Sequence, residues 1–427
     1  LAFSLSSPEL PFVLMISIDG LRADRLWASD VELPTLRRLA REGVHARGVV
    51  GVVPSITYPS HTTLITGVTP DVHGIYGNRL FDPEGRAAGS YWDARDIRVP
   101  TLPLAVRSRG VSVGSVSWPV SVGLDVDVLF PEYFGLPQAK LLRTWREQSR
   151  PSSLLDDVES SRGRTFRFPF TDADRVAIAA RVIQHDRPRF MLVHLFDADS
   201  AQHRYGPDSD EATRALVLED DHLQALLTAV NDAGLRDRMN VVVVSDHGFV
   251  NAPRQMQLNA VFKEAGWLTV DDRGRITSWR VFAQPAGGMA FVMLQDPTDT
   301  RLLRDVEVRL RDLARDPANG IERVLTREDL TRLGTDPRAS FGVFMAPGTY
   351  ATRGTRSVLA TSTARGGHGY DPELPAMHAT FVARGPNVPR RGDIGIIRMT
   401  QIAPTIASWY GTALSPRADV PIDLPTK

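Results

Sequence analysis

The 427-residue sequence contains no cysteine, which excludes disulfides, thiolate metal sites and cysteine nucleophiles. It also carries no net charge, because Lys plus Arg total 50 and Asp plus Glu total 50. This balance argues against an electrostatic binder of nucleic acid or membranes. No apolar run approaches the roughly 18–20 residues of a membrane-spanning helix. The strand-like runs Pro11 to Ile18 and Val241 to Val244 are much shorter.

The composition is that of a soluble folded protein, with 42% hydrophobic and 23% charged residues. The length predicts one large domain or two of medium size. The chain starts at Leu1 rather than Met, so we expect that an upstream segment was removed. A cleaved export signal predicts a periplasmic or secreted protein, with the cytoplasm as the alternative location.

Apolar runs typical of buried strands alternate with helix patterns along the chain. Strands are expected at Phe12–Ile18, Val111–Ser117, Phe190–Phe196, Val241–Ser245 and Ala379–Ala383. Helices are expected at Pro34–Glu42, Asp172–Gln184, Asp210–Asn231, Arg301–Arg315 and Met399–Tyr410. Near-continuous apolar strands separated by amphipathic helices indicate an α/β fold with a mostly parallel central sheet and helices on both faces.

We expect a single catalytic domain over residues 8–413, followed by a C-terminal tail over residues 414–427. Residues 130–170 are polar, with scattered Pro and Ser, and are predicted to be an insertion over the sheet. Residues 250–365 contain short elements and many turns, which predicts a second and larger insertion. Neither segment is expected to be an independent domain.

Three of the expected strands run directly into acidic residues. These residues are Asp19 after the first strand, Asp197 and Asp199 after Phe190–Phe196, and Asp246 after Val241–Ser245. Ligands of open α/β sheets bind at the carboxyl ends of the strands. Three carboxylates at one edge of a sheet therefore predict a functional site there.

Histidines accompany these carboxylates at spacings that suit a metal ion. Asp199 and His203 are four residues apart and share a helix face, although such pairs are common on surfaces. Asp246 and His247 are adjacent, and His368 lies between glycines that permit a close approach. Carboxylate and imidazole ligands without thiolate favour zinc, with manganese or iron as alternatives.

A second informative stretch runs from Pro54 to His61 and contains Thr57 and Ser60. A hydroxyl residue that opens a helix can present its oxygen to the sheet edge, where the helix-start amides favour an anion. The alternative interpretation is that Thr57 or Ser60 only caps the helix that follows.

Taken together, these motifs resemble the nucleotide pyrophosphatase/phosphodiesterase family of the alkaline phosphatase superfamily. The Thr-Phe-Pro-Asn-His segment of that family corresponds to Thr57-Tyr58-Pro59-Ser60-His61. Its further motifs correspond to Thr66-Gly67, Pro70, His73-Gly74-Ile75, Asn78, Asp199 to Pro207, Asp246-His247-Gly248 and Gly367 to Tyr370. The motifs occur in the family's order, and the likeness extends from about Phe12 to Gly411. The resemblance implies an alkaline-phosphatase-like fold.

The resemblance also implies two zinc ions and a covalent mechanism. One ion would be held by Asp199, His203 and His368. The other would be held by Asp19, Asp246 and His247, with the Thr57 oxygen as its reactive ligand. Thr57 would form a phosphothreonine-type intermediate, and Asn78 would hold a non-bridging phosphoryl oxygen.

The expected substrate is a small phosphate diester or a nucleotide, contacted by Tyr58, Trp118 and His194. Monoesterase relatives carry a Lys-x-Arg pair where this chain has the uncharged stretch Ser117 to Ser121. Trp118 offers apolar surface that suits an ester substituent, or it is core packing. His194 stands where many relatives have a Tyr that lines the nucleoside pocket, and a packed structural histidine is its alternative.

Other functions stay open at this stage. A phosphonoacetate-type hydrolase or a phosphomonoesterase would use the same metals, and a non-catalytic, metal-stabilised binding protein would keep the fold alone. Sulfatase chemistry is disfavoured, because Thr57 takes the nucleophile position and the chain has no cysteine. The oligomeric state is left open.

Overall fold

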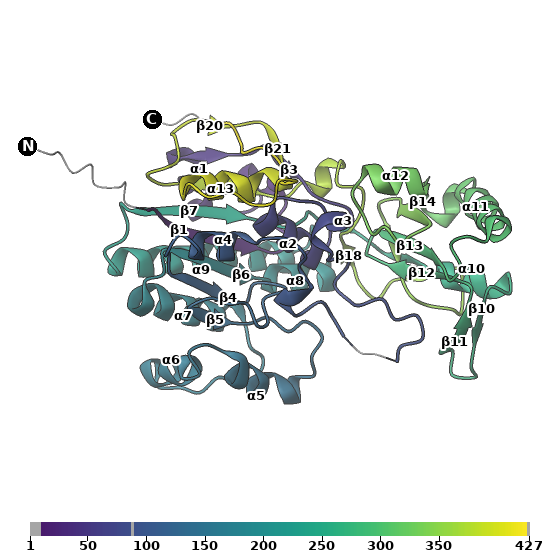
Figure 1. Ribbon diagram of the computed structural model, residues 1–427, viewed down its shortest axis with the longest axis horizontal. Helices are drawn as coiled ribbons and strands as arrows, with labels where there is room; N and C mark the ends of the chain where they lie inside the picture. The colour runs from purple at the N-terminus through teal and green to yellow at the C-terminus, as the bar shows by residue number, and fades with distance from the viewer. Residues whose placement is uncertain (1–9, 87–88, 425–427) are drawn as a thin grey trace, which may run out of the picture.

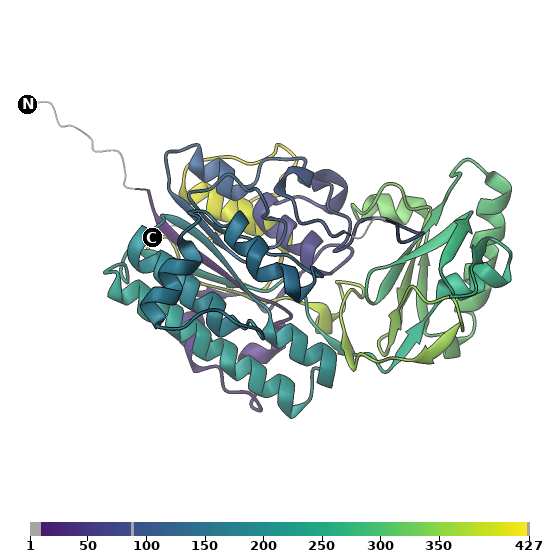
Figure 2. The ribbon, with the colours of Figure 1, turned by 90° about the horizontal axis from the view of Figure 1, so that it is seen from below.

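The computed structural model describes residues 10–86 and 89–424. Residues 8 and 9 of the expected catalytic domain, and residues 425–427 of the expected tail, lie outside the described residues. Figures 1 and 2 show a larger lobe built on one sheet and a smaller lobe built mainly on another. Among the described residues, none of the helices combines the length and the apolar character that a bilayer span requires.

The larger lobe contains an eight-stranded sheet in the order β20-β2-β19-β7-β1-β6-β4-β5. Its strands are β1 (Phe12–Ile18), β2 (Val44–His45), β4 (Val113–Val116), β5 (Val128–Phe130), β6 (Phe190–Leu195), β7 (Met239–Val244), β19 (Phe381–Arg384) and β20 (Gly392–Asp393). The five neighbours from β7 to β5 are parallel, and β19 is antiparallel to β7. The predicted mostly parallel sheet is therefore confirmed. The five predicted strands are present as β1, β4, β6, β7 and β19.

Helices cover both faces of this sheet. Successive residues of a strand point to opposite sides, so each buried strand contributes apolar side chains to two cores. Leu14 and Ile16 of β1 face a core shared with α1 (Pro34–Glu42), α6 (Leu154–Arg162), α7 (Asp172–Arg181) and α9 (Asp210–Asp232). Val13 and Met15 face a core shared with α2 (Thr57–Thr66), α4 (Leu102–Arg107) and α13 (Ile402–Trp409). The five predicted helices are present. A short turn of another helix type follows α7, and another precedes α13.

The smaller lobe comes mostly from the segment 250–365. Its four-stranded antiparallel sheet has the order β12 (Val281–Pro285), β13 (Met289–Leu294), β15 (Phe341–Met345) and β14 (Ile321–Leu325). One face packs on α10 (Leu258–Glu264) and α11 (Thr300–Ala314). The other face packs on Ile56, the residue before Thr57. The smaller lobe therefore helps to fix the start of α2.

Shorter elements complete the chain. They are β3 (Gly48–Val50), α3 (Pro70–His73), α5 (Gln138–Gln148), α8 (Asp197–Tyr205), β8 (Val250–Asn251), β9 (Arg254–Met256), β10 (Leu268–Val270), β11 (Ile276–Trp279), α12 (Arg327–Arg332), β16 (Thr349–Ala351), β17 (Leu359–Thr361), β18 (Gly366–Gly367) and β21 (Ile396–Arg398). The segment 130–170, expected as a polar insertion, contains α5 and α6 beside the edge strand β5. In Figure 1, α2, α8 and β18 lie where the two lobes meet.

Candidate active site

The carboxyl ends of three neighbouring strands bring the predicted carboxylates together. Asp19 follows β1, Asp246 follows β7, and α8 begins directly after β6 and carries Asp199. Nε2 of His247 lies 3.4 Å from Oδ1 of Asp19 and 3.0 Å from Oδ2 of Asp246. These three side chains form one candidate metal-binding cluster, with ligand atoms within 4.8 Å of one another.

A second group forms around Asp199. Oδ1 of Asp199 is 3.5 Å from Nε2 of His203 and 3.8 Å from Nε2 of His368. The two histidine nitrogens are 3.1 Å apart. Asp199, His247 and His368 also have ligand atoms within 4.8 Å, so His247 is within reach of both groups. The six residues implied by the resemblance are therefore adjacent in space.

Several of these atoms are buried without a hydrogen-bond partner. They are Oδ1 of Asp19, Oδ1 of Asp199, Oδ2 of Asp246 and Nε2 of His247. Burying unpaired polar atoms is costly, and carboxylates crowded together repel one another. A divalent cation would satisfy all of them with ligand types that zinc, manganese or iron accept. The residues present therefore fit a metal site.

Electrostatics within the cluster support this fit. Burial, followed by the charge of Asp246, raises the pKa of Asp19 well above its usual range. Burial alone would raise the pKa of Asp246 too, but the neighbouring His247 and other imidazoles lower it. Burial lowers the pKa of His368 well below its usual range, so this imidazole is neutral, which is the form that binds metals.

Thr57 is the first residue of α2 and is partly exposed at the edge of the sheet. The residue before it, Ile56, occupies the N-cap position, and no side chain caps this helix. Oγ of Ser60 is buried without a hydrogen-bond partner. The alternative interpretation of Thr57 or Ser60 as a helix cap is therefore wrong.

Asn78 lies beside the start of α2. The backbone N–H of Tyr58 donates a hydrogen bond of 2.9 Å to Oδ1 of Asn78. The ring of Tyr58 is buried, and its hydroxyl donates to Glu132. In this structure Tyr58 therefore orients the Asn78 amide through its backbone and contacts Glu132, from the segment 130–170, through its hydroxyl.

Two cavities meet at Thr57, Asn78, Phe134 and Asp199, which line both of them. The first, of about 640 Å³, is called the arginine cavity and is also lined by His203, His368, Arg79, Arg338 and Arg353. The second, of about 380 Å³, is called the aromatic cavity and is also lined by Tyr133, Trp145, Phe168, Phe170, Phe196, Asp19 and His194. Thr57 therefore lies where two different groups of one ligand can approach it, one from each cavity.

The two other predicted substrate contacts differ in their placement. His194 lines the aromatic cavity and is buried, with Nε2 3.6 Å from Oδ2 of Asp19. Trp118 is fully buried in the core and lines neither cavity. The rings of Trp118 and His61 are arranged edge to face, with their centres 5.0 Å apart. In this structure Trp118 is core packing, which was the alternative interpretation of its sequence position.

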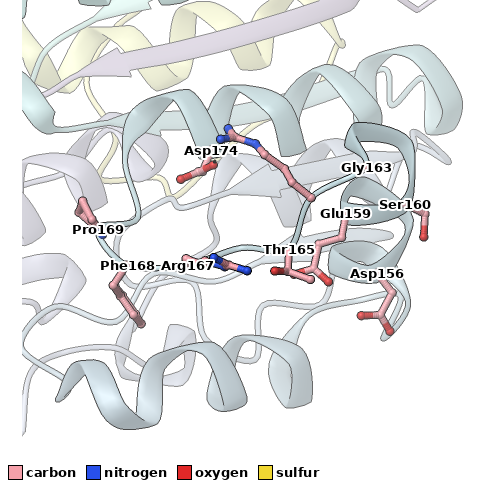
Figure 3. A pocket seen from close by; sticks show the side chains of 10 residues that line it. Asp156, Glu159, Ser160, Gly163, Thr165, Arg167, Phe168, Pro169 and Asp174 are labelled. Atoms are coloured by element: carbon pink, nitrogen blue, oxygen red, sulfur yellow. Dashed lines mark ion pairs between the residues drawn. The ribbon is translucent and has the colours of Figure 1, made fainter.

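A further hollow of about 970 Å³ lies between α6 and the loop that leads to α7 (Figure 3). None of the predicted site residues lines it. Its charges are largely matched internally, since Arg162 pairs with Asp174 at 3.0 Å and Arg146 pairs with Glu159 at 2.7 Å. This hollow is therefore a weaker candidate for chemistry than the strand ends.

Sequence reasoning assigned no role to His61, Glu132 or Arg353. Nδ1 of His61 lies 2.8 Å from the carbonyl oxygen of Thr57 and 3.6 Å from Oδ2 of Asp246. The spacing of four residues from Thr57 was a signal for His61. Glu132 and Arg353 come from the two segments expected as insertions, and their local sequence carries no comparable pattern.

Several known proteins are similar to this chain in sequence. A family described as "Type I phosphodiesterase / nucleotide pyrophosphatase" matches residues 13–371. Human ectonucleotide pyrophosphatase/phosphodiesterase family member 1 is 26% identical over 56% of this chain and 24% of its own length. Rat family member 3 is 24% identical over 89% of this chain and 39% of its own length. Bis(5'-adenosyl)-triphosphatase enpp4 of Xenopus laevis is 25% identical over 62% of this chain and 54% of its own length. The chain therefore spans from about a quarter to about half the length of these relatives.

Solved structures show the same fold. Murine ectonucleotide pyrophosphatase/phosphodiesterase 5, in an inactive form in complex with AMP, is 22% identical with a TM-score of 0.68 over 96% of each chain. The human counterpart is 21% identical with a TM-score of 0.67, covering 95% of this chain and 96% of the other. This likeness confirms the predicted alkaline-phosphatase-like fold.

Proposed function

The chain belongs to the type I phosphodiesterase / nucleotide pyrophosphatase family, and we propose that it hydrolyses phosphodiester or phosphoanhydride bonds with the help of metal ions. One observation carries this proposal. Three carboxylates from neighbouring strand ends gather with three histidines at the edge where Thr57 begins α2. The names of the ectonucleotide relatives support a periplasmic or secreted location, which cell fractionation tests.

The six clustered side chains are proposed to hold two divalent cations, with zinc favoured over manganese or iron. Asp199, His203 and His368 would hold one, and Asp19, Asp246, His247 and the Thr57 oxygen would hold the other. When bound, such ions lower the pKa of a ligating hydroxyl and stabilise the charges of an in-line displacement. The buried oxygens of Asp19, Asp199 and Asp246 that lack hydrogen-bond partners support this assignment.

Thr57 is proposed to be the nucleophile. The proton of its hydroxyl passes to solvent water. Its Oγ forms a bond to phosphorus while the bond from phosphorus to the leaving oxygen breaks, and the leaving group departs with that electron pair. The product on the protein is a phosphothreonine. Water then attacks the same phosphorus, the bond to Thr57 breaks, and the threonine hydroxyl recovers a proton. The helix-start position of Thr57 supports this role, because the positive end of a helix dipole favours an anion there.

Asn78 is proposed to hold a phosphoryl oxygen. Its Oδ1 already accepts the N–H of Tyr58, so its amide nitrogen is the end that can donate to a ligand. A donor that is fixed before the reaction stabilises the charge that develops on the phosphoryl oxygens.

The two cavities favour a diester over a monoester. A diester places a substituent on each side of the phosphorus, and Thr57 and Asn78 line both cavities. A monoester carries about two charges and needs more cationic partners, whereas the stretch from Ser117 to Ser121 is uncharged.

The test compares kcat/KM for bis(p-nitrophenyl) phosphate, p-nitrophenyl phosphate and a phosphonate ester, with zinc restored to the protein. We expect a clear preference for the diester. A preference for the monoester or for a phosphonate ester would overturn the diesterase assignment in favour of a monoesterase or a phosphonoacetate-type hydrolase. Bound metal without turnover of any ester would identify a non-catalytic binding protein.

A further inference from the structure

The first turn of α8 carries Asp199, one of the proposed metal ligands. α8 follows β6 after the single residue Phe196, and Asp199 is its third residue. The first N–H groups of a helix have no partner within the helix, and a side chain just before the helix usually accepts them. Phe196 occupies the N-cap position of α8, and its side chain has no oxygen that could accept an N–H. The partner of these N–H groups therefore comes from another part of the chain.

Asp172, the first residue of α7, is that partner. The backbone N–H groups of Phe196 and Asp197 donate hydrogen bonds of 2.7 and 2.6 Å to Oδ2 of Asp172. In return, the backbone N–H of Asp172 donates a hydrogen bond of 2.9 Å to Oδ2 of Asp197. The starts of α7 and α8 therefore cap each other, and a carboxylate oxygen is favoured at the start of a helix by the helix dipole.

Arg175 fixes the orientation of the Asp172 carboxylate. Its Nη1 donates a hydrogen bond of 2.9 Å to Oδ1 of Asp172, and both side chains are almost fully buried. The guanidinium also lies over the ring of Phe196, 3.7 Å from the ring centre. With Oδ1 bound to Arg175, Oδ2 is the oxygen that stays directed at the start of α8.

The later part of α8 is held by different contacts. Nε2 of Gln202 donates a hydrogen bond of 3.1 Å to the carbonyl oxygen of Gly20, and Nδ1 of His203 lies 3.0 Å from the carbonyl oxygen of Gly366. These contacts leave the first turn to be fixed by Asp172. Because Asp199 lies in that turn, a shift of the turn would move its carboxylate away from the two histidines beside it.

We propose that Asp172 is a positioning residue for the metal ion that Asp199, His203 and His368 would hold. Asp172 is outside this ligand set and acts through the backbone of α8, whose first turn sets the place of the Asp199 carboxylate. Residues that support metal ligands in this way affect the affinity of the site. This inference rests on the proposed function, since it concerns one of the two proposed metal sites.

The second proposed ion provides a contrast within the same protein. Its ligands Asp19, Asp246 and His247 follow β1 and β7, and none of the three lies on α8. Loss of the Asp172 cap should therefore weaken the binding of one ion and spare the other. A residue that only stabilised the fold would not distinguish the two ions.

Asp220 on α9 offers a matched control. It is a buried aspartate like Asp172, and its carboxylate also accepts two successive backbone N–H groups at the start of a helix. These are the N–H groups of Thr35 at 2.9 Å and Leu36 at 2.8 Å, in α1. None of the proposed metal ligands lies on α1. Asp220→Asn should therefore lower stability through the loss of a helix cap without changing the affinity for metal.

The test measures zinc binding rather than activity. Full-length wild type, Asp172→Asn and Asp220→Asn are freed of metal and titrated with zinc against a chelator of known affinity. Thermal unfolding of the metal-free proteins measures the loss of stability in each variant. We expect one of the two zinc ions to bind about 10- to 100-fold more weakly in D172N, the usual cost of losing a residue that supports a metal ligand. Both ions should bind to D220N as they do to the wild type.

A double variant identifies the affected ion. His368→Ala removes one ligand of the first proposed site and leaves the ligand set of the second intact. Adding Asp172→Asn to H368A should therefore not change the affinity of the ion that remains. If D172N does not fold, Asp172→Glu takes its place in each titration. The same selective loss is expected there, because the longer side chain cannot place its carboxylate at the same point.

The remaining outcomes separate the positioning role from the proposed function. If the wild type binds two zinc ions and D172N binds both with the same affinities, the positioning role is wrong and the proposed function stands. Equal losses in D172N and D220N, or equal weakening of both ions in D172N, would also overturn the positioning role, because they indicate a general loss of stability. If the wild type binds fewer than two zinc ions, the proposed two-metal site is wrong, and the positioning role is wrong with it.

Discussion

The imidazole rings of His247 and His368 are stacked face to face, with their centres 3.6 Å apart and their planes inclined by 7°. His247 follows β7, whereas His368 follows β18 at the junction with the smaller lobe. Each ring belongs to a different proposed ligand set, so the two sets are in direct contact through the stacked rings. This arrangement would keep two metal ions close together, as two-metal displacement chemistry requires.

The first prediction concerns metal content. The purified protein should hold about two zinc ions per chain, and His368→Ala should lose about one of them. Elemental analysis of the variants measures this directly, with His185→Ala as a control at an exposed histidine outside the clusters. One ion or none in the wild type, together with activity that chelators leave unchanged, would contradict the two-metal site.

The second prediction concerns the nucleophile. Thr57→Ala should lose nearly all turnover while it folds and binds metal, whereas Thr57→Ser should keep part of the activity because the hydroxyl survives. Steady-state kinetics, thermal unfolding and metal content are measured together. Ser60→Ala is the matched control, since the buried Ser60 hydroxyl has no hydrogen-bond partner. Near wild-type turnover in Thr57→Ala would rule out the covalent mechanism.

The third prediction concerns Asn78. Asn78→Ala should lower kcat/KM on the order of 10²–10³-fold, the usual loss for one charge-stabilising donor. Asn78→Asp keeps an acceptor for the Tyr58 N–H but replaces the amide donor with a carboxylate oxygen, so it should be at least as damaging. Melting temperatures of the two variants separate stability from catalysis. A fully active Asn78→Asp variant would show that the amide nitrogen does not contact the substrate.

The fourth prediction concerns pH and stability. Burial raises the pKa of Glu132 to about 7, while the hydrogen bond from the Tyr58 hydroxyl acts in the opposite direction. A carboxyl whose pKa is higher in the folded state binds its proton more tightly there. Its contribution to stability is therefore present at low pH and is lost as pH rises from about 4.5 to about 7. The size of this loss is roughly 3 kcal/mol.

Glu132→Gln removes this titration and keeps an oxygen for the Tyr58 hydroxyl. The melting temperature of the variant minus that of the wild type should therefore increase between pH 4.5 and pH 8. Thermal unfolding across this range measures the difference, and Glu264→Gln on α10 controls for the loss of an exposed carboxylate. A difference that stays constant with pH would show that Glu132 is ionised throughout.

Local patterns predicted much of the fold. The buried run Phe12–Ile18 and the helix Pro34–Glu42 have the predicted bounds, because hydrophobic periodicity and chain breakers act over a few residues. The helices of the segment 130–170 were not predicted, since their polar sequences carry weak periodicity. Trp118 was expected at the substrate, but a Trp beside a strand end has the same local pattern whether it packs inward or lines a cavity.

By itself, the sequence determined which chemical groups follow which strands, including Asp19 after β1 and Asp246 after β7. Only the tertiary structure decided that these groups meet, because the lateral order of strands depends on contacts between distant parts of the chain. The hydrogen bond of 3.1 Å from the Gly20 N–H to Asp246 Oδ1 is one such contact. The tertiary structure likewise brought Arg353 of the smaller lobe to the cavity that Arg79 also lines, since packing between lobes leaves no periodic trace in either segment.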